Sequence, residues 1–189
     1  MRIGIFGGAF NPPHNGHLIM SILSIEYLKL DKLFIVPTFN PPHRDPHELA
    51  PFEKRYLWLE KIFQGVKKIE ISDYEKVKGG KSYSIETVRY FRAVYGVKPY
   101  FIIGEDSAIN FHKWYMYETL MREASFAVYP RFRESRYQKL KEKYPDFIFM
   151  DLPLIEISST EIRNRIRERK SIRGMVPLSI ESEVIDTYL

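Results

Sequence analysis

Two histidines three residues apart, His14 and His17, follow two glycines and two prolines near the start of the chain. An apolar run over residues 2–6 precedes them, so the order is strand, glycine turn and helix start. At a helix start, unpaired backbone N–H groups and the positive end of the helix dipole favour bound negative charge. The dipole also favours neutral imidazole, and a bound polyphosphate would oppose that effect. The segment therefore predicts an anion-binding loop.

The apolar residues that follow this loop predict an amphipathic helix over residues 16–29, because they recur at spacings of three and four. Asn15 is a residue type that caps helices, and prolines ahead of a helix start remove no intrahelical hydrogen bond. Two other interpretations stay open: an ordinary tight turn, and two metal-ligating histidines. Residues 1–25 contain no cysteine, aspartate or glutamate that could complete a metal site. We therefore predict no metal ligands in the protein.

A second candidate for anion binding is the segment 158–163. Ser158 followed by Glu161 is a capping-box pattern, which predicts a helix whose first residues, Ser159 and Thr160, have unpaired N–H groups and outward-facing hydroxyls. Arg163 lies one turn further and could reach the same anion. An ordinary capped helix with a solvated basic face explains the same pattern.

These two segments together resemble a known family. Residues 7–17, GGAFNPPHNGH, are similar to the (H/T)xGH signature of the nucleotidyltransferase superfamily, in the form found in bacterial nicotinate-nucleotide adenylyltransferases. Residues 158–163 resemble the family's Ser-Ser-Thr-x-x-Arg motif, whose hydroxyls and arginine hold ATP phosphates. The resemblance implies that His14, His17 and Arg163 are the catalytic residues. It also implies an ATP site that includes Gly7, Gly8, Ala9, Phe10, His14, His17, Ser158, Ser159, Thr160 and Arg163.

Three segments between these motifs also resemble parts of the family. The proline-rich loop after the second predicted strand resembles the segment near the phosphate of the mononucleotide, and residues 82–87 resemble one near the nicotinate pocket. An aromatic residue further on resembles the one that stacks on the pyridine ring. The nicotinate mononucleotide ligands implied are Asn40, His43, Arg44, Tyr83, Ser84, Thr87 and Trp114.

Residue types alone leave other interpretations for these segments. Ser84 with Thr87 is also a helix N-cap signal, and His43 with His47 is a weak metal pattern within a proline-rich loop. The resemblance implies that Gly104 and Asp106 contact the nucleotide. Glu105 stands where the family usually has a small or neutral residue, which leaves that edge of the pocket undefined.

Alternating strand and helix patterns predict an α/β fold. Apolar, β-branched runs occupy residues 2–6, 33–37, 68–72, 100–104, 126–129 and 147–151, and helical patterns occupy 16–29, 52–64, 84–95, 115–123, 134–143, 160–169 and 180–188. This order is typical of βαβ units. We predict one nucleotidyltransferase domain over residues 1–189: a Rossmann-like, doubly wound parallel sheet with a C-terminal helical segment, binding ligands at the carboxyl ends of its strands.

Composition narrows the setting of the protein. The chain of 189 residues has no cysteine and a net charge of +5, and no apolar stretch approaches the length of a membrane span. We expect a cytoplasmic protein that binds neither membrane nor nucleic acid, and a homo-oligomer is compatible with the sequence. Nucleic-acid binding through the basic run Arg163, Arg165, Arg167, Arg169, Lys170 and Arg173 is the non-enzymatic alternative.

The resemblance implies one reaction. The 5′-phosphate of nicotinate mononucleotide attacks the α-phosphorus of ATP in line, giving deamido-NAD and pyrophosphate, with Mg²⁺ bound to ATP. No nucleophilic side chain is implied. The alternative within enzymes is an adenylyl- or cytidylyltransferase that acts on another phosphate monoester, such as phosphopantetheine.

Overall fold

The computed structural model describes residues 1–42, 48–131 and 135–189. Its centre is a six-stranded, fully parallel sheet with the strand order β3-β2-β1-β4-β5-β6. The strands are β1 (Ile3–Gly8), β2 (Lys32–Pro37), β3 (Ile69–Ile71), β4 (Tyr100–Gly104), β5 (Ser125–Tyr129) and β6 (Ile148–Phe149). The strand order reverses between β1 and β4, which is where an open α/β sheet binds its ligands.

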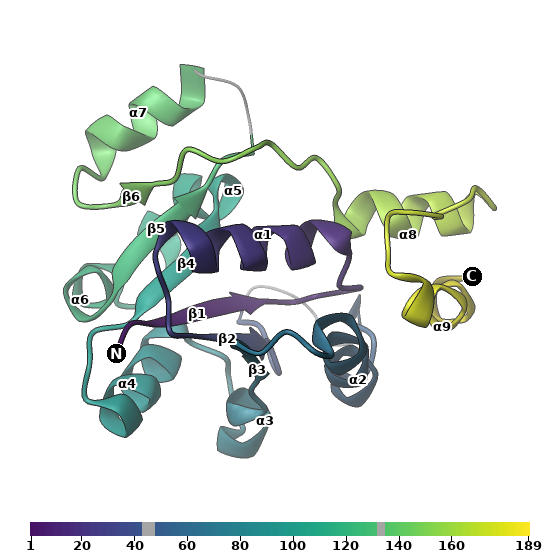
Figure 1. Cartoon of the computed structure of the whole chain (residues 1–189), viewed down its shortest axis with the longest axis horizontal. Coiled ribbons are helices and arrows are strands. Elements are labelled where there is room, and N and C mark those ends of the chain that lie inside the picture. Colours follow the sequence, from purple (N-terminus) through teal and green to yellow (C-terminus); the bar gives the residue numbers. More distant parts are fainter. Residues whose placement is uncertain (43–47, 132–134) are drawn as a thin grey trace.

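Helices cover both faces of this sheet (Figure 1). One face packs against α1 (Asn15–Tyr27), α2 (Phe52–Phe63), α8 (Ser159–Arg167) and α9 (Leu178–Tyr188). The other face packs against α4 (Ser84–Tyr95), α5 (Glu105–Ile109), α6 (Tyr117–Glu123) and α7 (Ser135–Lys143). Short elements complete the described chain: α3 (Tyr74–Lys78) and the 3₁₀ turn η2 (Phe111–Lys113). The predicted α/β, doubly wound architecture is confirmed.

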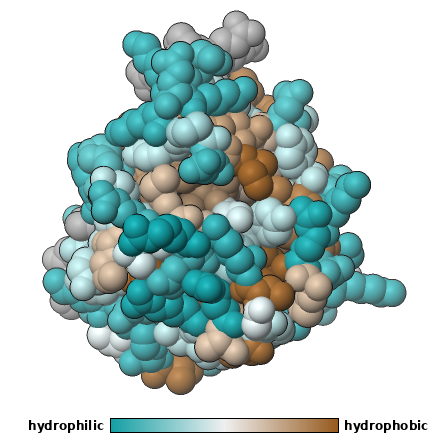
Figure 2. All heavy atoms as spheres, turned by 90° about the vertical axis from the view of Figure 1, so that its left-hand side faces the viewer, coloured by the Kyte–Doolittle hydropathy of each residue, from teal (hydrophilic) through white to brown (hydrophobic). Residues whose placement is uncertain are grey.

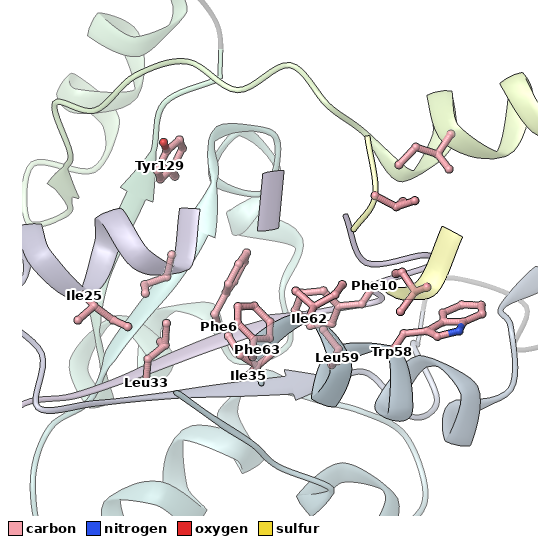
Figure 3. Close-up of a cluster of buried hydrophobic side chains, with 14 of the residues drawn as sticks. Phe6, Phe10, Ile25, Leu33, Ile35, Trp58, Leu59, Ile62, Phe63 and Tyr129 are labelled. Carbon is pink, nitrogen blue, oxygen red and sulfur yellow. The ribbon is translucent and has the colours of Figure 1, made fainter. Parts of the chain in front are cut away.

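Alternation along β1 shows how the two faces are built. Ile3 and Ile5 belong to the cluster beneath α4 to α7, whereas Phe6 belongs to the cluster beneath α1 and α2, because successive strand residues point to opposite faces. Figure 3 shows Phe6, Leu33 and Ile35 of the sheet within the cluster beneath α1 and α2. At Gly4, a Cβ atom would lie only 2.5 Å from the end of the Leu30 side chain, so a larger residue there would force Leu30 to shift.

The predicted helices and strands are present with their ends shifted by at most two residues, whereas α3 and α5 were not predicted. Two predicted caps were wrong. His14, not Asn15, is the N-cap of α1, and Tyr83, not Ser84, is the N-cap of α4. Asn15 instead donates its backbone N–H to Met175 and its side-chain amide to Gly174, at 2.9 and 2.7 Å. The side chain of Asn15 therefore makes a long-range hydrogen bond instead of the helix cap that its residue type favours.

The sheet's carboxyl ends point away from the face drawn in Figure 2, which shows the side of the molecule at the left of Figure 1. That face is largely hydrophilic, with apolar atoms exposed in patches between charged side chains. None of the helices in the described residues has both the length and the apolar character needed to cross a bilayer.

Candidate active site

A cavity of about 530 Å³ lies at the carboxyl ends of β1 and β4. It brings together every residue that the sequence assigned to ATP. Its lining comprises Phe6, Gly7, Gly8, Ala9, Phe10, Asn11, His14, His17, Met20, Ile103, Gly104, Asp106, Ser107, Trp114, Tyr129, Pro130, Arg131, Ile155, Ile157, Ser158, Ser159, Thr160 and Arg163. The wall therefore combines residues from between positions 6 and 17 with a segment about 150 positions later.

The two histidines are held as a stacked pair at the start of α1. Their ring centroids are 3.7 Å apart, and the backbone N–H of His14 donates to Nδ1 of His17 at 3.1 Å. That bond places the proton of a neutral His17 ring on Nε2, leaving an N–H donor on the other side of the ring. Phe10 packs its ring edge against His17 at 4.9 Å. Gly16 leaves room for the pair, because a Cβ there would lie 2.9 Å from Nδ1 of His14.

Both histidines are neutral in the free protein. Burial, with a smaller contribution from the nearby Arg131 guanidinium, lowers the pKa of His14 to about 3. Burial also lowers the pKa of His17 well below its ordinary value, helped by His14 and Arg131. The predicted preference for neutral imidazole is confirmed, although burial is its main cause. Neutral rings present N–H donors to an anion without the repulsion of two adjacent positive charges.

The second half of the cavity is the start of α8. Ser158 is its N-cap, with Oγ accepting from the N–H of Glu161 at 3.1 Å, as predicted. The predicted outward hydroxyl was wrong for Ser159, whose Oγ donates to the carbonyl of Pro12 at 2.8 Å. Arg163 donates to the carbonyl of Asn11 at 2.7 Å. The two motifs are thus joined by direct hydrogen bonds.

Arg131 is a cavity residue that sequence reasoning missed. It follows β5, and its guanidinium pairs with the carboxylate of Asp106 at 2.7 Å. Its backbone N–H donates to Glu105 at 2.9 Å, and Glu105 is fully buried and absent from the cavity lining. Glu105 therefore supports the loop after β5 from below. The available signal was position, since Arg131 lies just beyond the carboxyl end of a predicted strand.

A smaller cavity of about 140 Å³ adjoins the first one at Trp114, which lines both. Its other lining residues are Pro42, Ser82, Tyr83, Ser84 and Tyr115. Three of the residues assigned to the mononucleotide, Trp114, Tyr83 and Ser84, therefore meet here. The Tyr83 and Tyr115 ring centroids lie 4.6 Å apart, and with Trp114 aromatic residues make up half of the lining.

Two other residues assigned to the mononucleotide, Asn40 and Thr87, line neither cavity. Thr87 is buried and donates its hydroxyl to Glu75 at 3.2 Å. The backbone N–H of Asn40 donates to Oγ of Ser82 at 3.0 Å, and its carbonyl accepts from the Ser82 N–H at 2.8 Å. His43 and Arg44 lie outside the described residues. Asn40 is thus held beside the smaller cavity by its backbone.

Glu75 supports this side of the site from α3. Burial raises its pKa, and its carboxylate accepts from the backbone N–H of Phe39 at 3.1 Å as well as from Thr87. Within the ranges described, no group of three or more His, Cys, Asp or Glu side chains is arranged to hold a metal ion.

Comparisons with known proteins agree with this arrangement. The cytidylyltransferase-like family matches residues 5–165. A Pseudothermotoga lettingae protein named "Probable nicotinate-nucleotide adenylyltransferase" is 52% identical, over 99% of this chain and 96% of its own. A relative of the same name from Thermotoga sp. (strain RQ2) is 48% identical, over 97% and 94%.

A solved structure shares the fold. Plasmodium falciparum nicotinic acid mononucleotide adenylyltransferase, complexed with NaAD, superposes with a TM-score of 0.82 at 20% identity, covering 98% of each chain. The relatives' names do not favour the alternative acceptor phosphopantetheine. With these identities over nearly its whole length, the chain belongs to the nicotinate-nucleotide adenylyltransferase family.

Proposed function

We propose that the protein transfers the adenylyl group of ATP to nicotinate mononucleotide, releasing pyrophosphate and forming deamido-NAD. The observation that carries the proposal is the pair of adjoining cavities with Trp114 in the wall of both. The larger one has the histidine pair and Arg163 on its lining, as a polyphosphate requires. The smaller one has the aromatic lining that suits a pyridine ring.

The reaction needs no nucleophilic side chain. An oxygen of the mononucleotide 5′-phosphate forms a bond to the α-phosphorus of ATP, and the bond from that phosphorus to the bridging oxygen of the leaving pyrophosphate breaks. Catalysis then consists of alignment and charge stabilisation. His14 and His17 offer N–H donors to the phosphates, and Arg163 offers a positive charge to the pyrophosphate as it leaves. The histidines bind and stabilise without carrying protons between substrates.

The nucleoside of ATP would bind beyond β4. Gly104 leaves open space at the strand end, since no atom lies within 4 Å of where its Cβ would be. Asp106 lies beside it on the first turn of α5 and could accept hydrogen bonds from ribose hydroxyls. Because Asp106 pairs with Arg131 in the described structure, nucleotide binding would exchange or share that ion pair.

We place Mg²⁺ with ATP as part of the substrate. The donor set suits this arrangement, because the described residues offer no cluster of metal-ligating side chains, and Mg²⁺ commonly binds phosphate oxygens and water. The ion would neutralise phosphate charge during the transfer. We further propose that residues 1–189 act as one catalytic domain, since one cavity is lined by residues from position 6 to position 163. A cytoplasmic location is part of the proposal, since the absence of cysteine fits that setting.

A coupled pyrophosphate assay with ATP tests the proposal. Nicotinate mononucleotide, nicotinamide mononucleotide and phosphopantetheine are compared as acceptors, with release from the nicotinate compound expected to be fastest. Rejection of both mononucleotides would refute the proposal, whereas a preference for phosphopantetheine would replace the acceptor. Steeply salt-dependent RNA binding without pyrophosphate release would favour the non-enzymatic alternative.

A further inference from the structure

Asn11 lines the larger cavity and joins four parts of the chain there. Its side-chain amide donates to the carbonyl of Glu48 at 3.1 Å, and its Oδ1 accepts from the N–H of Ala50 at 2.8 Å. Its backbone carbonyl accepts from Arg163 at 2.7 Å. The side chain is 3% exposed, and Asn11 lies between the glycine turn and His14. Any shift of Asn11 therefore moves the acceptor that anchors Arg163.

The fourth part is α9, whose last residue, Tyr188, donates its hydroxyl to Oδ1 of Asn11. These two residues are 177 positions apart in the sequence. Burial raises the pKa of Tyr188, so the hydroxyl keeps its proton and acts as a donor at neutral pH. Because the backbone N–H of Ala50 donates to the same oxygen, two donors from different parts of the chain hold the side-chain amide of Asn11.

Independent contacts hold α9 in place at a distance from Asn11. Glu183 accepts from the indole N–H of Trp58 at 3.0 Å and pairs with Lys61, both on α2. Figure 3 shows Trp58 beside Leu59 and Ile62, with α9 next to them. The docking of α9 therefore has contacts that do not involve the Tyr188 hydroxyl, whose hydrogen bond is to Asn11.

We propose that Tyr188 is a positioning residue for ATP: its hydroxyl fixes Asn11, and Asn11 holds Arg163 at the polyphosphate. The chemistry of the site explains why the position of Arg163 must be fixed. Arg163 has a long side chain with many rotamers, and a guanidinium contributes to transition-state stabilisation only when it is already in place. The backbone carbonyl of Asn11 supplies that anchor, and α9 fixes the carbonyl's own residue.

The test is Tyr188→Phe, which keeps the ring and removes only the hydroxyl. Because this proposal rests on the proposed function, kinetics are accompanied by calorimetric binding of a non-hydrolysable ATP analogue. We expect kcat/KM for ATP and affinity for the analogue each to fall about 3- to 10-fold, as for loss of one hydrogen bond. KM for nicotinate mononucleotide should stay within about twofold, since the smaller cavity makes no contact with Tyr188.

The matched control is Glu183→Gln, which weakens the docking of α9 without touching Asn11. We expect a lower melting temperature and a smaller fall in kcat/KM for ATP than in Tyr188→Phe, because the Tyr188 hydroxyl is still present. The proposal is overturned if Tyr188→Phe behaves as wild type, or if Glu183→Gln lowers kcat/KM for ATP equally. If the wild type releases no pyrophosphate, the proposed function fails, while the analogue affinities of the two variants still decide the role of Tyr188.

Discussion

The two cavities are built from motif residues in different ways. Around the larger one, the histidines and α8 line the wall directly, and hydrogen bonds from Ser159 and Arg163 join the two motifs. Around the smaller one, some motif residues hold neighbouring segments in place and do not line the cavity. Thr87 donates to buried Glu75, and the backbone N–H of Asn40 donates to Ser82. A motif residue can therefore act on a ligand or on the loop that meets the ligand, and only the contacts separate the two.

The largest expected effect is on the phosphate side. Replacing His17 by alanine removes its Nε2–H donor, and we expect kcat to fall about 100-fold or more, as when a charge-stabilising donor is lost. His17→Asn is the sharper variant, because Asn Oδ1 can still accept from the His14 backbone N–H as Nδ1 does. Both variants should lose activity alike in the pyrophosphate assay. A rate near wild type in either variant would contradict the assigned role.

The phosphate side of the site, with His14, and the mononucleotide side, supported by Glu75, should also differ in how pH affects the stability of the fold. The folded pKa of His14, about 3, lies below its unfolded value of about 6.5, so the unfolded chain binds more protons between those values. Neutral His14 therefore stabilises the fold fully above pH 6.5, and acidification removes that contribution. Between pH 7 and pH 5 we expect a loss of about 2 kcal/mol from this residue. The raised pKa of Glu75 acts in the opposite direction, because stability from its protonated form is lost as pH rises.

Urea unfolding at pH 7, 6 and 5 measures this effect. His14→Gln should lose less stability on acidification than the wild type, whereas His112→Gln, at an exposed position, should follow the wild type. Parallel curves for the wild type and His14→Gln would show that His14 is not the residue whose burial opposes protonation.

A smaller effect is expected from crowding the histidine pair. In Gly16→Ala the new Cβ would lie 2.9 Å from Nδ1 of His14 and 3.0 Å from its Cε1, so the ring must move. We expect kcat/KM for ATP to fall about 10-fold through displaced donors. Alanine is the better helix former, which offsets part of the cost of crowding His14 and Ile155. Unchanged activity would show that the ring position is not critical.

Much of the architecture could be predicted, because alternation and helical periodicity are local properties of the sequence. The site was only partly accessible in this way. Arg131 follows a strand without any motif of its own, and the partnership of Asn11 with Tyr188 spans most of the chain. Such contacts depend on how whole elements pack. The same holds for Thr87, whose motif position gives no sign that its hydroxyl is buried against Glu75.

The smallest effect is expected on the mononucleotide side. Oγ of Ser82 accepts from the backbone N–H groups of Phe39 and Asn40, at 3.2 and 3.0 Å. Ser82→Ala leaves the Asn40 N–H without that acceptor, and we expect KM for nicotinate mononucleotide to rise about 5-fold, as for one neutral hydrogen bond. KM for ATP should change by less than about twofold, because Ser82 lines only the smaller cavity. Ser72→Ala, which removes a hydroxyl that accepts from Tyr74, serves as the control. An equal rise in both KM values would mean that the two sides are not independently supported, and the contrast between them would fail.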